Sequence, residues 1–209
     1  MSSAHHHHNH QHPHGHGHGH DYASANQAFF DKHAHTTEHR PMAAELAASI
    51  RNAVLGAYAF DKDTTTVMDF ACLWGVDISQ GMVDEFNKRV AEEGIDGEKM
   101  RAQRVSELKA EGTGSELGDA KFDVIFSSVA FHHIQDLVST TRTLATFLNP
   151  GGVLLVVDFP VMDFSKFPAD MQNDVVAMAG LQGFEWTLFK GAKTEMHPEE
   201  MFIAKGVKV

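Results

Sequence analysis

Two apolar segments separated by a helical pattern constrain the fold of this chain more than any other feature. Residues 122–128, FDVIFSS, and residues 153–159, VLLVVDF, are rich in apolar and β-branched side chains, so each predicts a buried strand. Between them, apolar residues recur at helical spacing from 137 to 148, and NPGG at 149–152 ends the helix. A strand, a helix and a strand at this spacing predict a parallel sheet covered on both faces. We therefore expect an α/β fold.

Two further strands are predicted unusually close together in the sequence. Residues 67–72, VMDFAC, read as a buried strand that contains Asp69, and residues 74–79, WGVDIS, read as a second strand that ends near Asp77. Neighbouring parallel strands normally need a crossover of about a dozen residues or more, and the short separation here leaves no room for one. The sequence therefore leaves two alternatives: residues 67–78 form one long strand, or one of the two strands is lost.

Weaker patterns predict the other elements of the fold. Their spacing of apolar residues is helical in some segments and alternating in others. The expected elements are a helix over 42–58, a helix that Ser79 caps and that ends near Gly94, a strand over 100–108, a helix around 171–179, and an antiparallel pair of edge strands at 184–189 and 201–204.

Four blocks, DFAC, GVDISQGMV, FDVIFSSVAFHHI and LNPGGVLLVVDF, resemble in order and spacing the class I S-adenosylmethionine-dependent methyltransferase family, in particular its small fungal members. The resemblance covers residues 22–209. It implies a Rossmann-like sheet, mostly parallel, with an antiparallel C-terminal hairpin. The family's glycine-rich motif and the helix after it should follow Cys72 and are missing, so we expect an incomplete first crossover. An exon missing from the gene model between Cys72 and Leu73 is an alternative explanation.

The resemblance also implies which residues bind S-adenosylmethionine. Asp77 matches the family's acid for the ribose hydroxyls, Ile78 and Met82 match residues along the adenine, and Asp69 matches the acid that orients the glycine turn. Glu107 matches an acid at the adenine edge by location only, and a solvated loop glutamate is the alternative. The expected cofactor-binding residues are Asp69, Ala71, Asp77, Ile78, Met82 and Glu107.

His132 and His133 are the candidates for catalysis, and no other catalytic residue is assigned. They lie just past the carboxyl end of the strand at 122–128, where open α/β sheets place ligands. Methyl transfer from a sulfonium depends mostly on positioning, and a general base is required only where the acceptor must lose a proton. Two neighbouring histidines without a third ligand do not make a metal site, so we expect no metal in the domain.

Residues 1–21 differ in composition from the rest of the chain. They hold most of the 16 histidines and no aliphatic residue between 5 and 20, which predicts a disordered tail before a domain at 22–209. The tail is either a solvated segment or a tract that binds Zn, Ni or Cu. The aromatic residues Tyr22 and Phe29 to Phe30 either cover the cofactor or anchor the start of the domain.

Charge and composition limit the partners and the location. With 28 acidic against 17 basic residues, the net charge is −11, which argues against direct nucleic-acid binding. The single cysteine, Cys72, excludes an internal disulfide and fits a reducing compartment. Neither a membrane span nor a secretory signal is recognisable. We expect a cytoplasmic protein, with a nuclear location as the alternative.

These features predict a methyltransferase that acts on a small molecule or a protein side chain and that is impaired by the missing glycine turn. Without that turn, the methionyl end of the cofactor loses backbone amides that would otherwise bind it. The alternative is a non-catalytic scaffold that serves as the partner subunit of another protein. A metal-binding or storage function of the tail would leave the patterned remainder unexplained.

Overall fold

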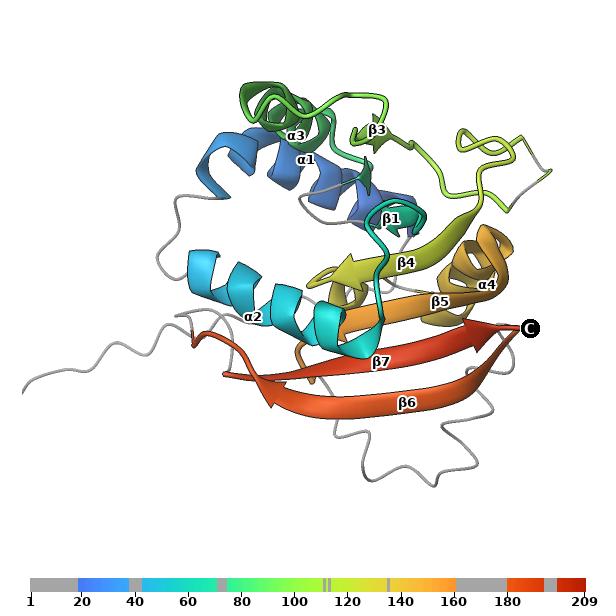
Figure 1. Ribbon diagram of the computed structural model, residues 1–209. Helices are drawn as coiled ribbons and strands as arrows, with labels where there is room; N and C mark the ends of the chain where they lie inside the picture. The colour runs from blue at the N-terminus through green and yellow to red at the C-terminus, as the bar shows by residue number, and fades with distance from the viewer. Residues whose placement is uncertain are drawn as a thin grey trace, which may run out of the picture.

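The computed structural model describes residues 19–37, 43–70, 75–110, 112, 114–134, 136–160, 180–193 and 199–209. They form a sheet with helices on both faces (Figure 1). In chain order the elements are α1 (Gly19–Thr37), α2 (Ala43–Ala57), β1 (Val67–Asp69), β2 (Val76–Asp77), α3 (Gln80–Glu92), β3 (Gln103–Arg104), β4 (Phe122–Ser128), the 3-10 turn η1 (Phe131–His133), α4 (Leu137–Thr146), β5 (Leu148–Asp158), β6 (Leu181–Lys190) and β7 (Glu200–Lys208). Within the described residues, no helix has the length and apolar character needed to cross a membrane.

The strands follow a single order across the sheet. Five of them pair in the order β1-β4-β5-β7-β6, and β2 pairs with β3. A parallel bridge between Phe70 and Val76 joins the two groups, which gives the order 3-2-1-4-5-7-6. The pairs β1 with β4, β4 with β5, and β2 with β3 are parallel, whereas β7 runs antiparallel to β5 and β6. The predicted α/β fold, mostly parallel with an antiparallel C-terminal hairpin, is confirmed.

The central strand β5 divides the core into two layers. Val153, Leu155 and Val157 pack in the apolar cluster under α2, and Leu154 and Val156 pack in the cluster under α4. Figure 1 shows these two helices on opposite faces of the sheet. Because successive side chains of a strand point to opposite faces, a strand buried on both faces has a continuous apolar sequence. This burial explains the run VLLVV.

The structure contradicts both alternatives for residues 67–78, because the two strands exist and are separate. β1 pairs with β4, β2 pairs with β3, and the two touch only through the bridge between Phe70 and Val76. Gly75 allows the close approach: it has φ +126°, and a Cβ there would lie 2.7 Å from the carbonyl oxygen of Asp69. Residues 71–74, including Ala71 and Cys72, lie outside the described residues.

Most of the other predicted elements are confirmed, with changed bounds. The helix at 42–58 is α2, the helix after Ser79 is α3, and the edge pair is the β6–β7 hairpin, which is longer than predicted. The strand expected over 100–108 shrinks to two residues, because only β2, itself two residues long, is present for it to pair with. The helix expected around 171–179 lies outside the described residues, and α1 was not predicted.

Candidate functional site

The parallel strands end at one edge of the sheet, and polar side chains are gathered there. Asp69 is the last residue of β1, Asp77 of β2, Ser128 of β4 and Asp158 of β5. In open α/β sheets, ligands bind beyond the carboxyl ends of the strands. This edge, which we call the carboxyl edge, is therefore the candidate site.

Asp69 is a buried carboxyl group at the end of β1. Its residue is 6% exposed, and within the described part of the chain neither carboxylate oxygen has a hydrogen-bond partner. Burial raises the pKa of Asp69 well above its ordinary value, and the nearby charge of Asp77 raises it further. A buried polar group without a partner costs free energy, so this carboxyl is suited to a ligand that supplies a donor or a positive charge.

Asp77 lies next to it, half-buried at the end of β2. Burial raises the pKa of Asp77 to about 6, and the backbone N–H groups of Ser79 and Ile78 oppose this shift. The Ser79 N–H donates to Asp77 Oδ1 at 2.7 Å. The charge of Asp31 also raises this pKa. Asp77 therefore changes its charge close to neutral pH.

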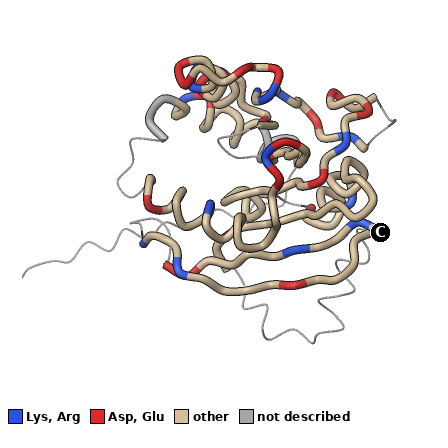
Figure 2. Tube along the Cα trace, viewed as in Figure 1, with Lys and Arg blue, Asp and Glu red and all other residues tan. Residues whose placement is uncertain are grey.

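The helix α3 begins directly beyond Asp77. Ser79 caps it, with its Oγ accepting a hydrogen bond from the backbone N–H of Met82 at 3.2 Å, as the sequence predicted. Met82 is buried with Val83 and Phe86 on the inner stripe of the helix. Figure 2 shows acidic and basic residues interspersed along α3 and the segment that follows it. The helix is thus amphipathic, and its N-terminus faces the candidate site.

Helix α1 contacts both the start of α3 and the turn after β4, and it lies beside α3 in Figure 1. Asp31 Oδ1 accepts hydrogen bonds from Ser79 Oγ at 2.6 Å and from the Gly81 N–H at 3.0 Å. The preceding residue, Phe30, packs edge-on against the ring of His133, with centroids 5.9 Å apart. Two adjacent residues of α1, Phe30 and Asp31, therefore contact the turn after β4 and the start of α3 respectively.

The turn η1 carries His132 and His133, whose ring centroids are 3.9 Å apart. Asp158 Oδ1 lies 2.7 Å from His132 Nδ1, and Oδ2 accepts from the His132 backbone N–H at 3.0 Å. The N–H of Phe159 also donates to Oδ1, at 2.7 Å. The Asp158 side chain is 2% exposed and that of His132 is 18% exposed. A buried carboxylate thus holds one of the two histidines in a fixed orientation.

Comparison with known proteins identifies the fold family. The profile of the methyltransferase domain family matches residues 62–156, from just before β1 into β5. This part of the chain is therefore similar to a methyltransferase domain.

A curated relative and two solved structures of the same fold are also methyltransferases. An uncharacterized methyltransferase of Schizosaccharomyces pombe is 30% identical over 135 residues, which are 57% of this chain and 47% of the relative. The alignment therefore spans about half the length of that curated relative. The magnesium protoporphyrin IX methyltransferase of Synechocystis, solved with bound S-adenosylmethionine, superposes with a TM-score of 0.61 at 14% identity, covering 90% of this chain and 98% of that one. A putative methyltransferase of Haloferax volcanii, solved in complex with the Trm112 methyltransferase activator, superposes with a TM-score of 0.61 at 15% identity. The match covers 85% of this chain and 96% of that one.

The methyltransferase fold brings together most of the residues that the sequence singled out. Asp69 and Asp77 lie close enough for their charges to interact, Ile78 is half-buried beside Asp77, and Met82 is buried in the first turn of α3. Glu107 stands apart: its side chain is 71% exposed and pairs with Lys109 at 3.2 Å. Ala71 lies outside the described residues, so its predicted role stays a prediction.

Two residues of this site were missed by the sequence analysis. Asp158 closes the strand at 153–159, a position that could have been read in the same way as Asp77. Asp31 carried no signal, because it lies in a polar stretch without a strong apolar pattern. Within the described residues, no group of three or more His, Cys, Asp or Glu residues could hold a metal ion.

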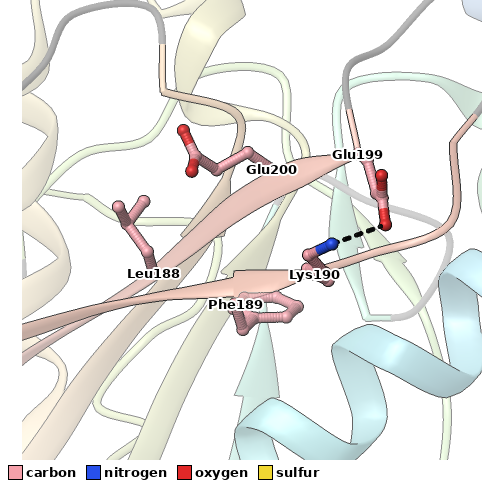
Figure 3. A pocket seen from close by; sticks show the side chains of 5 residues that line it. All are labelled: Leu188, Phe189, Lys190, Glu199 and Glu200. Carbon is pink, nitrogen blue, oxygen red and sulfur yellow. Dashed lines mark ion pairs between the residues drawn. The ribbon is translucent and has the colours of Figure 1, made fainter.

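A cavity of about 280 Å³ lies at the end of the β6–β7 hairpin. Figure 3 shows its lining, which includes an ion pair of 3.4 Å between Lys190 and Glu199. The register of β5 and β7 pairs Asp158 with Phe202, so this cavity opens on the carboxyl side of the sheet. Strands β4 and β5 lie between this cavity and Asp69, so it is separate from the candidate site.

Proposed function

We propose that this protein binds S-adenosylmethionine at the carboxyl edge and transfers its methyl group to a small molecule or a protein side chain. The observation that carries the proposal is the pair of neighbouring carboxylates, Asp69 on β1 and Asp77 on β2, beside the N-terminus of α3. S-adenosylmethionine supplies a methyl group that is already activated by the sulfonium. The protein has to position the acceptor and exclude water, which requires no nucleophilic side chain.

Each cofactor residue has a defined part in this proposal. Asp77 accepts hydrogen bonds from the ribose hydroxyls, and Ile78 and Met82 line the adenine. Asp69 stabilises the positively charged methionyl end, and Ala71, two residues later in the sequence, also binds the cofactor. Glu107 has the weakest support, because its side chain is exposed and paired with Lys109. We assign it to the adenine edge only when the cofactor is bound.

The short connection between β1 and β2 supports a second candidate function. A glycine turn supplies backbone amides that hold the cofactor, and its absence favours a non-catalytic scaffold that acts as a partner subunit. The putative methyltransferase of Haloferax volcanii, which has a similar fold, was solved in complex with an activator protein. In the first proposal the partner is the methyl acceptor, whereas in the second it is another protein chain.

Calorimetric titration of S-adenosylmethionine and S-adenosylhomocysteine tests the proposal. The full chain is first shown to be folded by circular dichroism. We expect binding in the micromolar range, roughly −8 kcal/mol, with Asp77→Asn at least tenfold weaker. Asp119→Asn, which removes an exposed carboxylate between β3 and β4, is the matched control and should bind as the wild type does. A folded chain that binds neither compound favours the scaffold.

A further inference from the structure

We propose that His132 is the general base of this enzyme, that Asp158 is its positioning residue, and that the methyl acceptor is therefore a hydroxyl group. The proposal rests on the methyltransferase function proposed above and names the acceptor class. It distinguishes His132 from its neighbour His133, which the sequence could not do.

The contacts of Asp158 show what the carboxylate fixes. One oxygen accepts the backbone N–H of His132, which is enough to anchor the turn. The other oxygen also contacts the ring atom Nδ1 at 2.7 Å, which a structural anchor would not need. Since an ionised carboxylate can only accept, Nδ1 carries the proton, and Nε2 is the basic ring atom. A buried carboxylate that orients an imidazole in one tautomer is the arrangement of a general base.

The position of the turn η1 places His132 at the carboxyl edge, where the cofactor is proposed to bind. His132 follows β4, which pairs directly with β1, so that Phe126 lies opposite Asp69. Phe30 packs on His133, and the next residue, Asp31, binds Ser79 at the start of α3. One turn of α1 thus spans the distance between the histidines and the residues next to Asp77. The contacts of His132 include the Asp158 carboxylate and the ring of His133.

The chemistry of a methyl acceptor decides which class needs this base. A neutral amine attacks through its lone pair and releases its proton afterwards, and a thiol ionises readily by itself. A hydroxyl becomes strongly acidic as it attacks, so a base that takes its proton in the transition state accelerates the reaction. In this step the hydroxyl oxygen bonds to the methyl carbon, the C–S electron pair stays on sulfur, and the hydroxyl proton passes to Nε2 of His132. Asp158 stabilises the resulting imidazolium, which later releases the proton to water.

Nuclear magnetic resonance of ¹⁵N-labelled imidazoles tests the geometry without catalysis. In the complex of the full chain with S-adenosylhomocysteine, His132 should show a protonated Nδ1, and added phenol should move the Nε2 signal. Asp158→Asn should change the ratio of the two tautomers. A wild-type His132 that is protonated on Nε2 contradicts the proposal.

Two matched pairs of probes test the acceptor class: phenol with thiophenol, and 2-naphthol with 2-naphthalenethiol. For the hydroxyl probes, His132→Ala should lower the rate of methyl transfer by about a hundredfold or more, and added imidazole should restore part of it. For the ionised thiols the same variant should stay within about threefold of the wild type. Asp158→Asn should lower kcat for the hydroxyl probes more than it changes KM. Asp119→Asn is the control.

Binding of S-adenosylhomocysteine separates this proposal from the function on which it rests. If wild type and variants bind it equally, yet His132→Ala methylates the hydroxyl probes as fast as the wild type, His132 is not the base. Transfer to the thiols alone, or to none of the probes, by a protein that binds the cofactor overturns the hydroxyl class. If the folded wild type does not bind S-adenosylhomocysteine, the methyltransferase function itself is refuted.

Discussion

Asp31 on α1 accepts a hydrogen bond of 2.6 Å from the hydroxyl of Ser79, the residue that caps α3. The same oxygen accepts the N–H of Gly81, so one carboxylate from a distant helix sits on the N-terminus of α3. A negative charge at this position is favourable for the helix dipole. These hydrogen bonds lower the pKa of Asp31, the bond from Ser79 most. The helix α1 is therefore attached to the carboxyl edge by an ionised side chain.

Removing this carboxylate should loosen α1. We expect Asp31→Ala to lower the free energy of unfolding by roughly 1 kcal/mol, because Ser79 Oγ and the Gly81 N–H lose their acceptor. Since the folded-state pKa of Asp31 is lowered, its contribution is present at neutral pH and disappears as the pH falls below the ordinary aspartate range. Urea unfolding at pH 7 and pH 3 measures the effect, with the exposed neighbour Lys32→Ala as control. An equal loss at both pH values would contradict the role of the charge.

Cofactor affinity should depend on pH through Asp77. With a pKa of about 6, Asp77 is mostly ionised at pH 7 and mostly protonated at pH 5, and only the carboxylate accepts both ribose hydroxyls well. We expect S-adenosylhomocysteine to bind about tenfold more weakly at pH 5 than at pH 7. The charged or titratable neighbours include Asp69 on β1, Asp31 on α1 and Arg104, which lies opposite Asp77 on β3.

The variant Asp77→Asn separates this carboxylate from the other two. Its affinity should be low at pH 7, and most of the difference between pH 5 and pH 7 should be gone. Calorimetric titration at both pH values provides the measurement. If the wild type binds equally well at pH 5 and pH 7, Asp77 does not contact the cofactor as proposed.

The buried carboxyl of Asp69 should destabilise the ligand-free protein at high pH. Its folded-state pKa is raised, so between the unfolded and folded values the native state holds more protons, and stability falls as the pH rises through that window. We expect Asp69→Asn to be more stable than the wild type at pH 8, on the order of 1–3 kcal/mol, and equal to it near pH 4. The fall of the free energy of unfolding with rising pH should become weaker in this variant without disappearing, because Asp77 contributes in the same sense. Urea unfolding across this range tests the sign, with Asp119→Asn as control.

The parts of the fold that the sequence predicted well are those whose burial dictates composition. β4 and β5 are buried on both faces, and that burial requires the apolar runs from which they were predicted. The α3 start was also predictable, because Ser79 caps the helix by a local contact within three residues. By contrast, β2 and β3 are too short to show an alternating pattern of apolar residues, and their bounds depend on pairing with each other.

The parts of the site that the sequence could not predict are contacts between distant segments. His132 and Asp158 are 26 residues apart in the chain and meet because β4 and β5 are neighbours. Asp31 and Ser79 are 48 apart, and α1 has no apolar pattern strong enough to show where it docks. Sequence analysis therefore found His132 as a candidate, but neither its partner nor the difference between it and His133.

The close packing of α1 against α3 should be visible in a pair of glycine substitutions. A Cβ added to Gly81 would lie 3.2 Å from the Asp31 carbonyl oxygen and 3.3 Å from Ala34 Cβ, so alanine there has to push α1 away. Gly56, also in a helix, has no heavy atom within 4 Å of such a Cβ. Alanine is favoured over glycine in helices, so Gly56→Ala should raise the free energy of unfolding by about 0.5–1 kcal/mol. Gly81→Ala should lower it despite the same helical preference, and amide hydrogens of α1 should exchange faster. If both variants are stabilised equally, α1 does not pack on α3 as closely as these distances require.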